Sequence, residues 1–183
     1  MRLLVILIFL NLVTAQFQKG TMSAASLFSY SASSNGGNTN HYMTTGTNPT
    51  QMDVVRIQPS FSYFINDKIS ADIWFGKYKY SQGDDLKLES KLYGIGITKY
   101  FFPFYYGMGY GLSNSTSNGY NSSGANIEFH LGSLFELSPY IFLDMGINYI
   151  QGIGEIQLTG NSEYSYDNEE TILQMGVGIK AFF

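Results

Sequence analysis

The side chains that could take part in acid–base, nucleophilic or metal chemistry are few in this 183-residue sequence. There is no Cys, and the two histidines, His41 and His130, lie far apart in the chain, whereas zinc sites draw their Cys and His ligands from short characteristic spacings. Neither His is followed at the second position by Ser, because Met43 and Gly132 stand there. We therefore expect no catalytic, cofactor-binding or metal-binding residues. An enzyme remains an alternative if a serine of a long connection lies beside His41 in the folded protein and forms a Ser–His pair.

Six ionisable side chains share the polar side of segments that otherwise alternate polar and apolar residues. They are Arg56, Asp72, Glu128, His130, Asp144 and Lys180. If this side faces an enclosed interior, each unpaired charge costs several kcal/mol, so we expect a network of opposite charges. Counting along the hairpin sets Arg56 level with Gly76 or Tyr78, so its partner is not simply Asp72. Such a network is either a structural plug, the interpretation we favour, or a path for protons or ions.

Eight segments alternate with a period of two residues, which predicts β-strands. In the last of them, Leu173 and Met175 share one face, while Gln174 and Gly176 share the other. Glycines also recur at every second position, as at Gly94 and Gly96, and small residues there make room for large neighbours inside a narrow barrel. The predicted strands are residues 21–33, 54–65, 69–80, 91–102, 104–113, 124–136, 140–151 and 173–183.

The connections between these segments alternate in length. Short turns fall at residues 66–68, around Pro103 and at residues 138–139. Long polar connections fall at residues 34–53, 81–90, 114–123 and 152–170. Short and long connections on opposite rims are typical of outer-membrane barrels. The sequence thus predicts an all-β fold, an eight-stranded antiparallel up-and-down transmembrane β-barrel with both termini on the side of the short turns.

The first fifteen residues have the features of a cleaved secretory signal peptide. Arg2 supplies a positive charge, residues 3–10 form an apolar run, and residues 13–15 end in Ala15 as a small-residue cleavage site. We therefore divide the chain into a signal peptide, residues 1–15, and a barrel domain, residues 16–183. Loss of Arg2 leaves 9 basic residues (10 minus 1) against 14 acidic ones. This acidic balance argues against a nucleic-acid partner.

The sequence resembles the small outer-membrane β-barrel family, which includes the OmpA-like barrels and the OmpX-like proteins. The resemblance rests on five pieces that occur in order at hairpin spacing: residues 18–21, 59–68, 99–102, 137–139 and 178–183. It implies location in a cell outer membrane, contact with outer-membrane lipid, and insertion by the barrel-assembly machinery, with the terminal Phe183 as the assembly signal. We also expect Phe183 to lie in an aromatic girdle with Tyr63, Phe101 and Phe135.

Two classes of function follow from these expectations. The first is a non-enzymatic structural or interaction protein, with Trp74 and the six ionisable residues filling the lumen and the long connections available to an extracellular partner. An eight-stranded barrel is just wide enough for side chains to fill. The second class is a small pore or channel or, by the family resemblance, a lipid A-modifying enzyme. A soluble lipocalin-type barrel does not fit, because its outward face would be polar.

Overall fold

The computed structural model describes residues 18–34, 51–82, 86–117, 120–159, 164–167 and 171–183. Residues 1–15, His41 and most of the connection at residues 34–53 lie outside this part of the chain, so the expectations placed on them stay predictions. The described elements are β1 (Met22–Ser34), β2 (Gln51–Asn66), β3 (Ile69–Gln82), β4 (Leu86–Phe101), β5 (Phe104–Ser117), β6 (Tyr120–Ser138), β7 (Ile141–Thr159), β8 (Tyr164–Asp167) and β9 (Thr171–Phe182). None of the described residues forms a helix long and apolar enough to cross a membrane.

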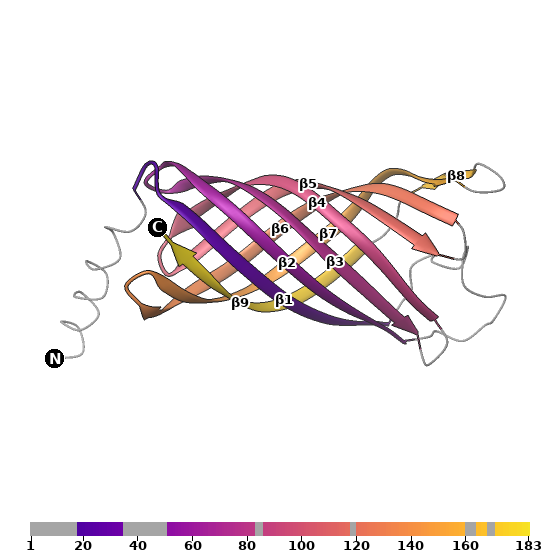
Figure 1. The fold of residues 1–183 in the computed structure, drawn as a ribbon, viewed down its shortest axis with the longest axis horizontal. Coiled ribbons are helices and arrows are strands. Elements are labelled where there is room, and N and C mark those ends of the chain that lie inside the picture. Colours follow the sequence, from indigo (N-terminus) through magenta and orange to yellow (C-terminus); the bar gives the residue numbers. More distant parts are fainter. Residues whose placement is uncertain (1–17, 35–50, 83–85, 118–119, 160–163, 168–170) are drawn as a thin grey trace.

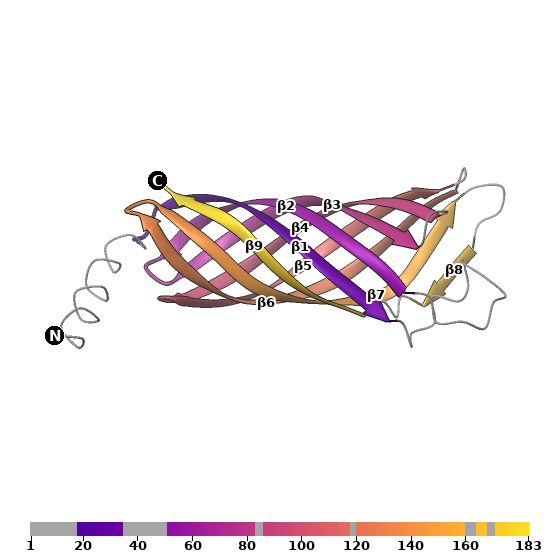
Figure 2. The same cartoon turned by 90° about the horizontal axis from the view of Figure 1, so that it is seen from below.

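Eight of these strands close into a ring in which each strand is antiparallel to its neighbours. The strands β1 to β7 follow one another in chain order, and β9 joins β7 to β1. The short strand β8 pairs with β7 and lies beyond the ring, as Figures 1 and 2 show. The predicted eight-stranded antiparallel barrel is therefore confirmed, and closure removes the unpaired strand edges that an open sheet would expose.

The alternation in the sequence becomes an apolar outside and a largely polar inside. On β3, Ile73 and Phe75 are about half exposed, whereas Asp72 and Trp74, which alternate with them, are buried. The same holds on β9, where Leu173 and Met175 point outward and Gln174 is fully buried. The outward apolar band also includes Phe28, Ile57, Phe61, Tyr93, Ile95, Ile97, Met108, Tyr110, Phe129, Leu131, Ile147, Val177 and Ile179.

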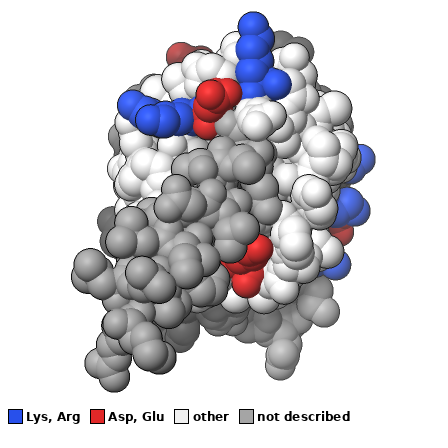
Figure 3. Space-filling view, turned by 90° about the vertical axis from the view of Figure 1, so that its left-hand side faces the viewer, with Lys and Arg blue, Asp and Glu red and all other residues white. Residues whose placement is uncertain are grey.

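The short turns and the C-terminus lie at the same end of the barrel (Figure 1). Figure 3 looks onto this end and shows a few charged side chains among mostly uncharged ones. In the first turn, the Asn66 side chain accepts hydrogen bonds from the backbone N–H groups of Lys68 and Ile69. Phe183 continues the ladder, because its backbone N–H and C=O both pair with Met22. Exposed aromatic side chains gather around this end, and they include Tyr63, Phe101, Phe135 and Phe183.

The long connections at the opposite end are shorter than predicted, because the strands continue through most of them. Residues 86–90, 114–117, 120–123 and 152–159, expected in connections, are strand, as are 164–167 in β8. Their Gly, Ser, Asn and Thr residues suggested loops, but composition is a weak guide when a neighbouring strand satisfies the backbone hydrogen bonds. Strand β7 also changes register near Gly154, which has a positive φ of 67°, and from there it carries β8.

The lumen as the candidate functional site

An aromatic cluster fills the lumen at the turn end of the barrel. Phe64, Tyr100, Tyr105, Leu134, Phe142 and Phe182 are all buried there, and Phe102 packs against them. The Phe182 ring lies edge-on to Phe142 with a centroid distance of 5.3 Å. Phe64 and Tyr100 are in contact at 5.0 Å. Packed aromatic side chains therefore occupy this end of the lumen.

Trp74 occupies the lumen further along the barrel axis. A Cβ atom added at Gly94, Gly96 or Gly109 would overlap its indole ring, so the ring lies directly against the backbones of β4 and β5. Leu92, Ile150 and Ile172 complete a second buried apolar cluster with Trp74. The glycines at every second position thus provide the space that a large inward side chain needs, as their spacing predicted.

Arg56 and Glu128 form a fully buried ion pair across the lumen. One guanidinium nitrogen, Nη2, donates to both Glu128 carboxylate oxygens, at 2.8 and 2.7 Å. The side chains are 0% and 4% exposed. Arg56 is level with Tyr78 on β3, one of the two positions that hairpin counting predicted. The pairing therefore crosses the lumen instead of following the hairpin.

Asp72 and His130 meet through a residue that sequence reasoning did not select, Thr98. The Thr98 hydroxyl donates to Asp72 Oδ2 at 2.6 Å, and His130 Nε2 lies 2.7 Å from the hydroxyl oxygen of Thr98. Since a hydroxyl has one proton, Thr98 accepts the second bond from a protonated Nε2. Ser70 donates to the other Asp72 oxygen. Here the hydroxyl lies between the acid and the imidazole, so the carboxylate does not orient the ring directly as it does in a catalytic triad.

The remaining two predicted charges are bound by tyrosines of the aromatic cluster. Lys180 Nζ donates to the Tyr100 hydroxyl oxygen at 2.6 Å and lies 5.1 Å from the centre of the Tyr100 ring. Tyr105 donates to Asp144 Oδ1 at 2.5 Å. Hydrogen bonds thus join Arg56 to Glu128 and, through Thr98, Asp72 to His130. Asp144 and Lys180 each bond to a tyrosine of their own.

Sequence reasoning missed Thr98, Tyr100 and Tyr105 as members of these groups. Their inward direction could have been found, because Thr98 and Tyr100 share the polar side of their strand with Gly94 and Gly96. Among the described residues, no group of three or more His, Asp and Glu side chains is arranged to hold a metal ion.

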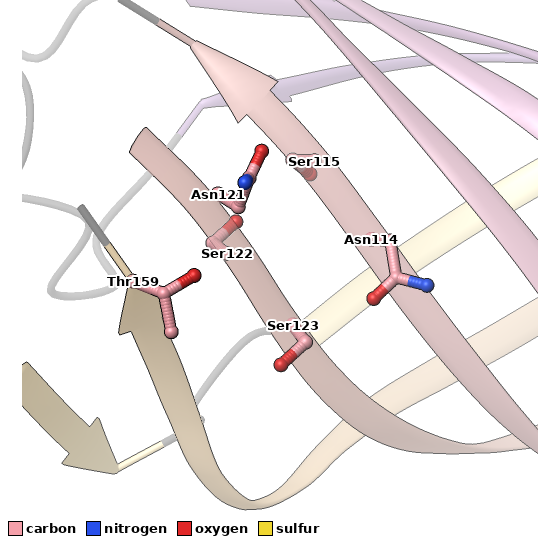
Figure 4. A pocket seen from close by; sticks show the side chains of 6 residues that line it. All are labelled: Asn114, Ser115, Asn121, Ser122, Ser123 and Thr159. Carbon is pink, nitrogen blue, oxygen red and sulfur yellow. The ribbon is translucent and has the colours of Figure 1, made fainter. Parts of the chain in front are cut away.

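A shallow polar pocket of about 310 Å³ lies at the end of the barrel opposite the turns (Figure 4). Its lining comes from the ends of β5, β6 and β7 and consists of neutral hydroxyl and amide side chains. They are Asn114, Ser115, Asn121, Ser122, Ser123 and Thr159. These groups both donate and accept hydrogen bonds, and the pocket lies far from the buried charges of the lumen.

Comparison with known proteins gives matches in structure alone. No family model and no curated protein matches the chain. Neisserial surface protein A aligns with a TM-score of 0.58 at 16% identity, covering 90% of this chain and 97% of that one. The outer membrane protein AlkL, solved in DMPC bilayers, gives 0.57 at 15%, covering 91% and 92%. The N-terminal β-barrel domain of Pseudomonas aeruginosa OprF gives 0.55 at 14%, covering 91% and 98%. The chain therefore has the fold of the small outer-membrane β-barrels, the fold its sequence resemblance implied.

Proposed function

We propose that the protein is an integral outer-membrane protein, exported by residues 1–15, that has no catalytic site and acts through its outer surface. The observation that carries this proposal is the combination of packed side chains in the lumen with an outward apolar band. Aromatic and aliphatic side chains about half exposed on every strand of a ring need an apolar surrounding, and a bilayer supplies one. The lumen meanwhile contains two apolar clusters and a buried ion pair.

The surface left for a partner is the end opposite the turns. We infer that an extracellular partner would bind the ends of the strands and connections at residues 34–53, 81–90, 114–123 and 152–170. The neutral pocket on β5 to β7 supports a partner rich in hydrogen-bonding groups, because its six side chains carry hydroxyls and amides without charge. Outer-membrane lipid, and the assembly machinery during insertion, complete the proposed partners.

A small pore is the second candidate, and one observation favours it. The lumen contains polar atoms that make no hydrogen bond to the described residues: Gln58 Oε1, Trp74 Nε1, Asn126 Oδ1 and Gln174 Nε2. Buried polar groups of this kind are commonly satisfied by water. Water beside Trp74 would give a partly wet lumen, interrupted by the aromatic cluster.

Two measurements test the proposal. Fractionation of cells that have an outer membrane should place the mature protein there, resistant to carbonate extraction and with heat-dependent mobility on gels. Planar-bilayer recording of the purified protein should give no steady single-channel current. A product in the soluble fraction would contradict the membrane location, whereas large steady currents would leave the location intact and support the pore.

A further inference from the structure

Three outward-facing lysines stand together on the β3–β4 hairpin, at the edge of the apolar band away from the turns. Lys77 and Lys91 are directly opposite each other in the ladder, and Lys79 is opposite Glu89. All four side chains are exposed. In the pair of residues nearer the turns, Phe75 faces Tyr93, and both are about half exposed as part of the band. The lysines thus begin where the apolar wall ends.

The four charged side chains lie at the corners of a square on the sheet surface. One diagonal joins opposite charges and the other joins two positive charges. Along one diagonal, Lys77 Nζ donates to Glu89 Oε1 at 2.5 Å. That hydrogen bond, followed by the charges of Lys77, Lys79 and Lys91, lowers the pKa of the Glu89 carboxyl, so the carboxylate is ionised at neutral pH. The other diagonal joins Lys79 and Lys91. Diagonal neighbours in an antiparallel pair are about 7–8 Å apart, within reach of long side chains.

The charge of this square is not balanced from within. Three lysines face one carboxylate, which leaves two positive charges in excess. Lysine stems lie along apolar surface while their ammonium groups reach the polar layer above it. On β4, Lys91 follows the apolar run of Tyr93, Ile95 and Ile97 in the direction away from the turns. Once the apolar band is in a bilayer, Lys91 therefore lies at the depth of the lipid headgroups.

We propose that Lys79 and Lys91 bind the phosphate of a lipid headgroup in the leaflet on this side, with Lys77 and Glu89 holding the hairpin in place beside it. The inference rests on the proposed membrane location and adds a specific lipid contact to it. Two flexible ammonium groups on one diagonal converge on a single phosphate, whereas a soluble polyanion would have no need of lysines adjoining the apolar wall. A lipid-facing lysine near anionic headgroups contributes about fivefold in affinity.

The mature protein, reconstituted in phosphatidylcholine vesicles, tests this contact with trace spin-labelled phosphatidylglycerol or spin-labelled phosphatidylcholine. We expect the protein to immobilise the labelled phosphatidylglycerol preferentially. Lys79→Gln with Lys91→Gln should remove most of this preference, while Glu89→Gln should increase it. The matched control, Lys19→Gln with Lys68→Gln, removes the same charge at the turn end and should keep the preference.

The outcomes separate this contact from the membrane location. Equal immobilisation of the two labelled lipids by a protein that is embedded, or an unchanged preference in the Lys79/Lys91 double variant, would overturn the lipid contact alone. Failure of the unmutated protein to enter vesicles would overturn the membrane location. A further experiment tests binding of sucrose octasulfate, a soluble polyanion. If it bound through Lys79 and Lys91 while labelled phosphatidylglycerol showed no preference, the site would serve a soluble polyanion and the proposal would be wrong.

Discussion

Arg56 on β2 and Glu128 on β6 are joined across the full width of the barrel. In the closed ring, four steps separate β2 from β6 in either direction, so the two strands are diametrically opposite. The ion pair therefore holds together strands that share no backbone hydrogen bonds. Both side chains are buried, which makes the pair sensitive to loss of either partner.

Replacing Arg56 by Met should destabilise the barrel. The substitution leaves the Glu128 carboxylate buried without its cation, and such a change costs about 3–5 kcal/mol. Urea unfolding of the protein in phospholipid vesicles measures the free energy, with Trp74 as a convenient signal because it is the only tryptophan in the chain.

The double variant Arg56→Met with Glu128→Leu separates the pair from the space that it fills. Because it removes both charges, we expect it to recover most of the stability that Arg56→Met loses. A double variant as unstable as the single one would show that the cost came from packing and not from the unpaired charge.

Adding a side chain at Gly109 should displace Trp74. A Cβ there overlaps the indole ring, and overpacking of this kind costs about 1–3 kcal/mol. We expect Gly109→Val to lower the urea midpoint and to shift the Trp74 emission to longer wavelength. Gly146→Ala is the control. A Cβ added at Gly146 lies 3.1 Å from the Leu131 carbonyl oxygen and from the Tyr105 hydroxyl, and it does not approach the indole. Unchanged emission in Gly109→Val would contradict the placement of Trp74.

Phe183→Ser should reduce insertion into the outer membrane. The resemblance to small outer-membrane barrels implies that the assembly machinery recognises the terminal aromatic side chain, and here that side chain is 66% exposed. The substitution preserves the backbone hydrogen bonds to Met22. Quantitative blotting of outer-membrane and periplasmic fractions measures the effect.

Phe104→Ser is the matched control for this assembly experiment. Phe104 is also an exposed phenylalanine at the turn end of the barrel, but it lies on another strand. We expect normal insertion of this variant. Equal loss in both variants would indicate that any aromatic side chain at this rim has the same role, and that Phe183 is not a specific signal.

Gly154→Val should loosen the end of β7 that carries β8. A residue with a side chain in this left-handed conformation costs about 1–2 kcal/mol. Because Gly154 lies where β7 changes register, the strain should remain local. We expect faster amide hydrogen exchange at residues 155–158, while residues 143–150 of the same strand exchange as before. Ile153→Val, beside the same change of register but replacing one β-branched side chain by another, should change neither region.

The direction of side chains could be predicted from the sequence, but their partners could not. Alternation places Arg56 and Glu128 on the inward side, because strand parity is a local property. Which inward residue lies opposite depends on the tilt and stagger of the whole ring, so the contact between Lys180 and Tyr100 has no signal in either strand alone. The strand extensions through residues 114–117 and 120–123 were missed for a related reason: their pairing, Asn114 with Ser123 for example, is decided by the neighbouring strand.

Lys180 on β9 and Tyr100 on β4 are also four steps apart around the ring, and their strands lie midway between those of Arg56 and Glu128. The two contacts therefore tie two different pairs of opposite strands, at different heights in the lumen. A cylindrical sheet flattens by lengthening one diameter and shortening the other, so each tie opposes the lengthening of the diameter that it crosses. Lateral pressure from the surrounding bilayer would then leave the cross-section round.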